Sequence, residues 1–151
     1  KPSYYAYYLL NKLGDTLVAK SNGYIVTKSN NEYQILLYNH HDNVDKLIPF
    51  ESFSKLRAVK NAASQKFSIN IVNIPSSIKI ITYEINEKSG SSYNYWLDMG
   101  KPKRLSKEEK QILHKASFPR IHFKNFKKST VFNIQTKLNG YGALLILIKE
   151  V

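Results

Sequence analysis

Cysteine is absent from this chain of 151 residues, and its absence excludes several kinds of site at once. Without a thiol there can be no disulfide framework, no thiolate zinc site and no cysteine nucleophile. Because disulfides are rare in a reducing compartment, a chain without cysteine fits the cytoplasm. We therefore expect a cytoplasmic protein that folds without covalent cross-links.

Long hydrophobic runs are also absent. The longest apolar run covers residues 143–148, which is the length of a buried strand, whereas a membrane-spanning helix needs about 20 apolar residues. We therefore expect no membrane partner. The opening residues Lys1, Pro2 and Ser3 do not form a signal peptide, and the segment has the character of the middle of a longer chain.

Acidic residues are few: 11 Asp and Glu stand against 23 Lys and Arg, for a formal net charge of +12. The imbalance is concentrated in residues 101–151, which hold 12 Lys and Arg but only 3 Asp and Glu. A basic surface can meet phosphate or an acidic partner. It can equally be the Lys-rich surface of an ordinary globular domain.

What the chain does have is a clear change of periodicity near its start. Residues 1–14 predict a helix, with three apolar side chains at three-and-four spacing: Tyr5, Tyr8 and Leu9. Tyr4 and Tyr7 form a second apolar edge. We expect Tyr5, Tyr8 and Leu9 to pack partly on the sandwich and Tyr4 or Tyr7 to be exposed. The other predicted domain, residues 15–151, alternates with period two.

This second region predicts about eight strands joined mostly by short turns. Because strands do not alternate with helices, a parallel α/β sheet is excluded and an antiparallel β-sandwich is favoured. Asn139 and Gly140 predict a hairpin turn between the last two strands. The expected fold is therefore mainly β, with an N-terminal helix and one short internal helix.

The internal helix is marked by a capping box, since Ser106 is followed three residues later by Glu109. Residues 90–96 predict a structured loop, and residues 52–63 carry a fainter helical pattern. Glycosidases need two carboxylates facing one sugar bond, but Glu84 falls on a polar strand face and Glu109 serves a helix start. No catalytic pair is marked.

Candidate ligand-binding residues are His40, His41 and Trp96. Imidazole beside Asp42 can hold a metal or move a proton, but adjacent side chains on an extended strand point in opposite directions, and a polar loop explains the cluster as well. Trp96 can stack on a sugar ring or pack at a core edge. We predict no catalytic, cofactor-binding or metal-ligating residue.

Two groups of residues together resemble a known family. The first comprises residues 1–14 (KPSYYAYYLLNKLG), 23–27 (GYIVT) and 33–39 (YQILLYN). The second comprises residues 90–93 (GSSY), Trp96, residues 99–102 (MGKP), Leu105, residues 108–109, Leu113 and residues 117–119 (SFP). Both are similar to the region after the catalytic barrel in glycoside hydrolase family 39, the β-xylosidase and α-L-iduronidase family.

The resemblance implies a β-sandwich that follows a (β/α)8 barrel. In that family the barrel carries the acid/base glutamate in an Asn-Glu-Pro sequence, and nothing here matches it. The resemblance therefore assigns no catalytic residue to this chain, which we expect not to be an enzyme. The opening helix would correspond to the last helix of the barrel, and its partner would be the preceding barrel.

The same barrel and sandwich also resemble the C-terminal region of some AraC-type bacterial transcription regulators, whose DNA-binding helix-turn-helix lies elsewhere in the chain. Our first hypothesis is a non-catalytic sandwich that supports a sugar-sensing barrel in such a regulator. The alternative is an accessory domain of an active β-xylosidase-like glycosidase. A third hypothesis is direct nucleic-acid binding by the basic C-terminal third, where Phe123, Lys124 and Phe126 interleave charge with aromatic rings.

Overall fold

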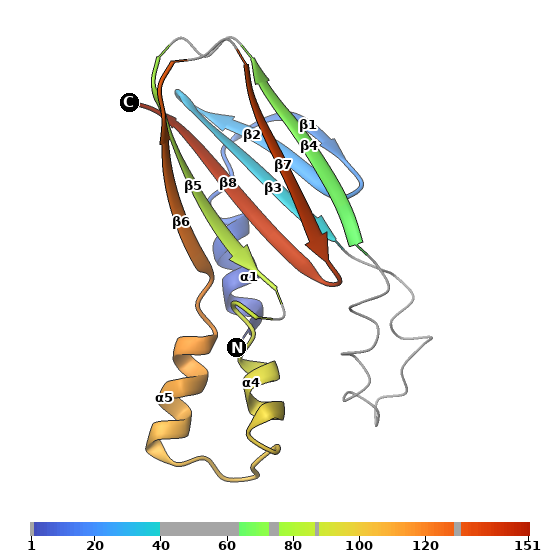
Figure 1. The fold of residues 1–151 in the computed structure, drawn as a ribbon, viewed down its shortest axis with the longest axis vertical. Helices are drawn as coiled ribbons and strands as arrows, with labels where there is room; N and C mark the ends of the chain where they lie inside the picture. Colours follow the sequence, from blue (N-terminus) through green and yellow to red (C-terminus); the bar gives the residue numbers. More distant parts are fainter. Residues whose placement is uncertain (1, 40–63, 73–75, 87, 129–130) are drawn as a thin grey trace.

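The computed structural model describes residues 2–39, 64–72, 76–86, 88–128 and 131–151, which form eight strands and three helices (Figure 1). In chain order they are α1 (Pro2–Leu10), β1 (Thr16–Ser21), β2 (Tyr24–Ser29), β3 (Glu32–Asn39), β4 (Ser64–Val72), β5 (Ile78–Ile85), α4 (Ser92–Asp98), α5 (Lys107–Ala116), β6 (Arg120–Phe126), β7 (Val131–Asn139) and β8 (Gly142–Glu150). The expected mainly β, antiparallel fold is confirmed. The helical pattern of residues 52–63 lies outside the described residues.

The strands form two antiparallel sheets of unequal size. The larger has the order β1-β2-β3-β8-β5-β6, and the smaller is a ribbon of β4 and β7. The ribbon covers one face of the larger sheet, and α1 lies against the other face (Figure 1). The described chain therefore has three layers, with the six-stranded sheet in the middle.

Burial on both faces explains the apolar sequence of the central strands. β8 runs in register with β3 on one side and β5 on the other. Its residues 144–148 are all buried: Leu144, Ile146 and Ile148 face the ribbon, while Leu145 and Leu147 face α1. A strand with only one covered face alternates instead, as β4 and β7 do, with half-buried Ile69 and Ile134 between exposed polar residues.

The connection at Asn139 and Gly140 corrects one expectation. Gly140 has a φ of +56°, so the local turn geometry is present. However, β7 pairs with β4 of the ribbon, and β8 pairs with β3 and β5 of the large sheet. The connection is thus a corner between the two sheets and not a hairpin turn, because burial of Leu138 in the core between the sheets separates the two strands.

A second correction concerns residues 90–96, predicted as a loop. Residues 92–98 form the helix α4, so the described chain has two internal helices. Ser91 precedes α4 without a side-chain capping bond, and aromatic residues favour helices only weakly, which is why the sequence signal was poor. Tertiary contacts stabilise it: α4 packs beside α5, and Trp96 Nε1 donates a hydrogen bond to the carbonyl oxygen of Pro102 at 3.1 Å.

Helix α5 follows the sequence closely. Ser106 Oγ accepts a hydrogen bond from the backbone N–H of Glu109, and the Glu109 carboxylate accepts one from the N–H of Ser106, so the predicted capping box is confirmed. Together α4 and α5 project beyond the end of the sandwich, close to the N-terminal end of α1 (Figure 1). Within the described residues, no helix is both long and apolar enough to span a membrane.

Candidate functional site: an exposed aromatic face

Helix α1 is held on the large sheet by one side of its surface. Leu9 is only 1% exposed and packs with Leu36, Leu145 and Leu147. The ring of Tyr8 meets the ring of Tyr83 edge-on, with 6.2 Å between centroids. Burying a leucine of this kind stabilises the fold by about 2 kcal/mol. The predicted packing of Tyr8 and Leu9 on the sandwich is therefore confirmed.

A buried polar cluster fixes the turn that joins α1 to β1. The backbone N–H of Gly14 donates to Thr27 Oγ1 at 2.8 Å and to Gln34 Oε1 at 3.1 Å, and Thr27 Oγ1 lies 2.9 Å from Gln34 Oε1. Thr27 and Gln34 are both buried. Buried polar groups must be paired to avoid a large desolvation cost, so this cluster anchors the helix in one position on the sheet.

Lys12 adds an electrostatic contact to the same side of α1. Its Nζ lies 4.5 Å from the ring centre of Tyr8 and 5.1 Å from that of Tyr83. Hydrogen bonding to Tyr8 is the main cause that raises the pKa of Lys12 above 10.5. The protonated ammonium therefore favours the docked helix.

The other side of α1 is apolar but uncovered. Tyr4 is 62% exposed and Tyr7 is 71% exposed, and Leu10 is exposed as well. The prediction that Tyr4 or Tyr7 would be exposed is thus confirmed for both. Scattered single apolar residues are normal on a protein surface, but three on one short helix make a patch.

The edge strand β6 extends this uncovered surface. Phe123 pairs with Ile81, and Ile121 pairs with Tyr83, so both β6 side chains lie on the sheet face that carries α1. The side chain of Phe123 is 65% exposed and that of Ile121 is 46% exposed. We call the exposed apolar set on this side the aromatic face; its members are Tyr4, Tyr7, Leu10, Phe118, Ile121 and Phe123.

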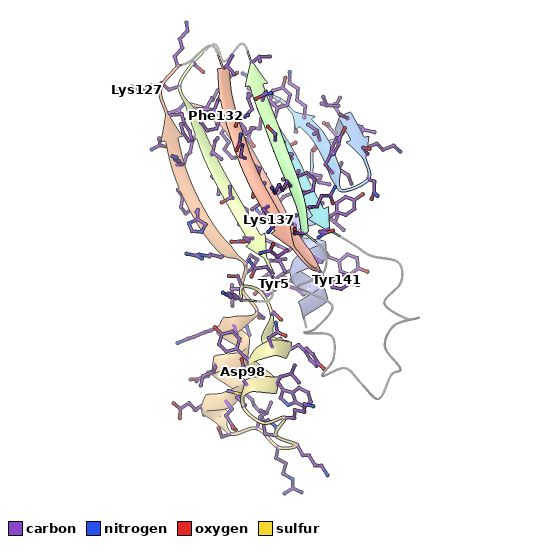
Figure 2. The ribbon with its side chains drawn as sticks, turned by 45° about the vertical axis from the view of Figure 1, so that its right-hand side comes forward. Tyr5, Asp98, Lys127, Phe132, Lys137 and Tyr141 are labelled. Carbon is purple, nitrogen blue, oxygen red and sulfur yellow. The ribbon has the colours of Figure 1, made fainter. Side chains whose placement is uncertain are left out.

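Phe118 joins the helix to the neighbouring segments. Its ring lies 5.2 Å from that of Tyr5 and 5.2 Å from that of His114 on α5. Figure 2 shows Tyr5 near the junction between the sandwich and the projecting α4 and α5. The aromatic face thus borders the helical projection through Phe118, and a concentration of exposed apolar side chains of this kind is typical of an interaction site.

The sequence candidates do not converge on one site. His40 and His41 lie outside the described residues. Trp96 is half-buried on α4, its ring is 5.8 Å from that of Tyr93, and its N–H is bonded to Pro102. Its role as a ligand-binding residue remains a prediction. The aromatic face was only partly visible in the sequence, because Phe118, Ile121 and Phe123 give no signal without knowledge of which strand lies at the sheet edge.

Three acidic side chains of the described residues have structural partners. Glu32 Oε1 pairs with Lys149 Nζ at 2.6 Å, and Glu84 Oε1 accepts a bond from Asn86 Nδ2 at 2.7 Å. Bonds from Ser106 lower the pKa of Glu109, as expected for a capping carboxylate. Within the described part of the chain, no three His, Asp or Glu residues gather in a way that would hold a metal ion.

Comparison with known proteins connects this fold to two groups. No protein-family model matches the chain. Among curated proteins, an uncharacterized HTH-type transcriptional regulator of Staphylococcus aureus (strain MRSA252) is 22% identical over 151 residues, covering 99% of this chain and 20% of the relative. A second such regulator of Staphylococcus aureus is 21% identical with the same coverage. The chain thus spans about a fifth of the length of the curated relatives it matches.

Among solved structures, the chain resembles the GH39 enzyme of Xanthomonas axonopodis pv. citri with a TM-score of 0.78, at 16% identity, covering 100% of this chain and 30% of that one. A monomeric β-xylosidase of Caulobacter crescentus CB15 gives a TM-score of 0.70 at 18% identity and 31% coverage of its chain. At such identities the likeness concerns the fold. The chain therefore has the fold of a region of these glycosidase structures, and its sequence has distant similarity to HTH-type regulators.

Proposed function

We propose that this domain is the non-catalytic β-sandwich of a glycoside-hydrolase-39-like region in an AraC-type bacterial transcription regulator. The observation that carries the proposal is the similarity to HTH-type regulators over 99% of the chain, at 22% identity. A regulator reads DNA through its helix-turn-helix, so the sandwich itself need not contact nucleic acid. Its role is to support a ligand-sensing barrel.

The aromatic face supports the contact with such a barrel. Leu9 on one side of α1 is buried in the sandwich, whereas Tyr7 on the other side is 71% exposed. A helix with apolar residues all round is normally buried on all sides. In this proposal α1 is the last helix of the barrel, and the barrel covers Tyr4, Tyr7 and the exposed residues of β6.

The ligand in this proposal is a sugar that binds to the barrel and biases DNA binding by the regulator. The fold likeness to β-xylosidase structures supports a carbohydrate, although fold alone does not assign a function. For the ligand to change DNA affinity, it must bind more tightly to one conformation of the regulator than to another. A rigidly anchored α1 is a means of passing that change to the sandwich.

The test uses the longer protein that the proposal requires, expressed from its native gene beside the 151-residue chain. We expect the longer protein to bind its own promoter DNA, to change affinity when xylose or xylobiose is added, and to leave nitrophenyl β-xyloside intact. The isolated chain should not bind DNA even at low salt. Salt-sensitive DNA binding by the isolated chain would instead support the basic C-terminal third as the binding element.

The alternative is an accessory domain of an active β-xylosidase-like glycosidase, favoured by the TM-score of 0.78 to a GH39 enzyme. It predicts that the longer protein hydrolyses nitrophenyl β-xyloside and that the isolated chain does not. Hydrolysis without sugar-dependent DNA binding would overturn the regulator proposal. DNA binding without hydrolysis would overturn the alternative.

A further inference from the structure

A groove runs along the uncovered part of the large sheet, on the side opposite the aromatic face. The two-stranded ribbon is too narrow to cover six strands. It buries Ile78 and Ile80 of β5, but the inner side of the edge strand β6, with exposed His122 and Lys124, stays open beside β7. The resulting groove has a volume of about 300 Å³, and its walls include Ile80, Thr82, His122, Lys124, Phe126 and Phe132. It is separate from α1, which lies on the other face of the sheet.

One end of the groove is built from two phenylalanine rings in contact. The centroids of Phe126 on β6 and Phe132 on β7 are 4.0 Å apart and the ring planes are tilted by 52°, so the two sheets touch there. Lys124 Nζ lies 4.9 Å from the centre of the Phe126 ring. Figure 2 shows Phe132 at the end of the sandwich far from Tyr5. The ammonium of Lys124 is therefore positioned beside an apolar floor.

The wall opposite β6 is a strand edge. Within the described residues β7 pairs only with β4, and residues 132–135 of β7 border the groove on the other side. The free edge of a strand presents backbone N–H and C=O groups to a further strand. A strand added about 4.8 Å from β7 would lie over His122 and Lys124 of β6, at the usual spacing of about 10 Å between packed sheets.

Charge selects the kind of strand that fits. Two of the residues lining the groove, His122 and Lys124, are basic, and none of the lining residues is acidic. Lys127 and Lys128 follow at the end of β6 and are exposed. A second copy of this chain, with its own net charge of +12, would be repelled by this surface. An acidic segment would be attracted.

We infer that this groove binds an extended acidic peptide by strand addition to residues 132–135 of β7, along the edge that no described strand pairs. Every second side chain of the peptide faces the sheet. We expect these inward positions to carry apolar residues beside Phe126 and acidic residues beside Lys124 and His122. Backbone pairing with β7 supplies affinity, and the inward side chains supply specificity. This inference concerns the opposite sheet face from the barrel contact and does not depend on the regulator proposal.

The test uses the 151-residue chain and fluorescence-labelled nine-residue peptides with capped ends. The acidic probe TVTETVTET places valine and glutamate alternately on one face and threonine on the other. Its control TVTKTVTKT reverses the charge. The peptide TVPETPTET keeps both glutamates and has prolines at positions 3 and 6, which face opposite edges of a strand, so in either register one of them lacks an N–H toward β7. We expect the acidic probe to bind at least about tenfold more tightly than either control, and to weaken as salt is raised.

Two protein variants locate the site. Lys124→Glu should weaken binding of the acidic probe by about tenfold or more, while the matched change Lys115→Glu on α5 should leave affinity within about twofold. Both lysines are exposed, so neither change should prevent folding. Amide hydrogen exchange should slow along β7 when the acidic probe is bound.

Any of three results in the peptide experiments would overturn the inference. These are equal affinity of the acidic and basic probes, an effect of Lys124→Glu no larger than that of Lys115→Glu, and no binding of the acidic probe at millimolar concentration. Concentration-dependent dimerisation of the chain without peptide, abolished by changes in β7, would identify a second copy as the occupant and would equally contradict an acidic peptide.

Discussion

The two faces of the large sheet differ in how completely the described chain covers them. On the ribbon side, eight residues of one cluster are buried, among them Ile35, Leu37 and Ile146. On the α1 side the buried cluster has four members, Leu9, Leu36, Leu145 and Leu147. Beyond α1 that face continues into exposed Ile121 and Phe123.

The difference shows which core the described chain completes and which it leaves partly open. A sandwich core needs side chains from two facing sheets, and the ribbon supplies them. A single helix of nine residues is too narrow to cover six strands, and a lone helix of that length is marginal in water. The packing of α1 on its face of the sheet is therefore less stable than the packing of the ribbon on the other face, and the α1 face has more surface available to a partner.

The largest expected effect is on the ribbon side. Ile146→Ala should lower the free energy of unfolding by about 4 kcal/mol, because Ile146 is 0% exposed and truncation leaves a cavity between the sheets. Urea denaturation measures the change. The control Ile112→Ala on α5 removes a partly exposed isoleucine and should cost less than about 1 kcal/mol. Equal losses of unfolding free energy in Ile146→Ala and Ile112→Ala would contradict the view that the core between the sheets contributes most to stability.

Leu9→Ala should cost about 3 kcal/mol, somewhat less than Ile146→Ala, since a docked helix can shift to fill part of the cavity. Hydrogen exchange should show faster opening of α1 while β3 and β8 keep their protection. If β3 and β8 lose protection equally, the two faces do not differ in stability.

Gly14→Ala tests the turn that fixes α1. A Cβ at this position would lie 2.6 Å from Gln34 Oε1 and 2.6 Å from the carbonyl oxygen of Lys28. Backbone must therefore move, at a cost of about 2 kcal/mol. The matched control Gly142→Ala introduces the same methyl group at a glycine where the nearest atom to an added Cβ, the carbonyl oxygen of Ile85, is 3.4 Å away. A cost for Gly142→Ala as large as that for Gly14→Ala would refute the explanation by close contact.

Lys12→Met should cost about 0.5–1 kcal/mol at neutral pH through loss of the contact with Tyr8 and Tyr83. Because the pKa of Lys12 is raised in the folded state, its contribution is full below its ordinary pKa of 10.5 and disappears as the pH rises through the higher folded value. The difference in unfolding free energy between the native chain and Lys12→Met should therefore shrink above about pH 10.5. A constant difference would argue against a charge effect.

The smallest expected effect in this chain is that of Tyr7→Ser, at most about 0.5 kcal/mol, since Tyr7 is 71% exposed. In the longer protein of our proposal the same change should cost about 3 kcal/mol, because Tyr7 would be buried against the barrel. Thermal unfolding of both proteins measures the contrast. Equal, small effects in both would remove Tyr7 from the barrel contact.

The strands of this fold could be predicted from the sequence because the burial of each strand produces a simple pattern of apolar and polar residues. Residues 143–148 form a continuous apolar run, as a strand covered on both faces requires. Period-two alternation in β4 and β7 and the capping box at Ser106 and Glu109 were equally local signals. Helix α4 was missed because contacts with α5 and the hydrogen bond from Trp96 to Pro102 stabilise it. These contacts do not appear in the periodicity or the capping residues of the α4 segment itself.

The candidate surfaces also include parts that local sequence predicts and parts that depend on the order of strands in the sheet. The exposure of Tyr4 and Tyr7 followed from helical spacing, since a helix with apolar residues on every side cannot bury all of them on one sheet. Phe123 became part of the aromatic face only because β6 is the last strand beside β5. The groove beside β7 depends on the sheet order even more, since no local pattern predicts that β4 is the strand of the described chain with which β7 pairs.

Composition alone gave the excess of positive charge and the exclusion of cysteine chemistry, and residues close together in the chain were sufficient to predict the periodicities and the helix cap. The partition of strands between the two sheets, the corner at Asn139 and Gly140, and the faces left uncovered depend on contacts between distant segments. The physical reason is that pairing between distant strands is selected by burial of the whole core, in which Leu138 and Ile146 from neighbouring strands enter the same cluster.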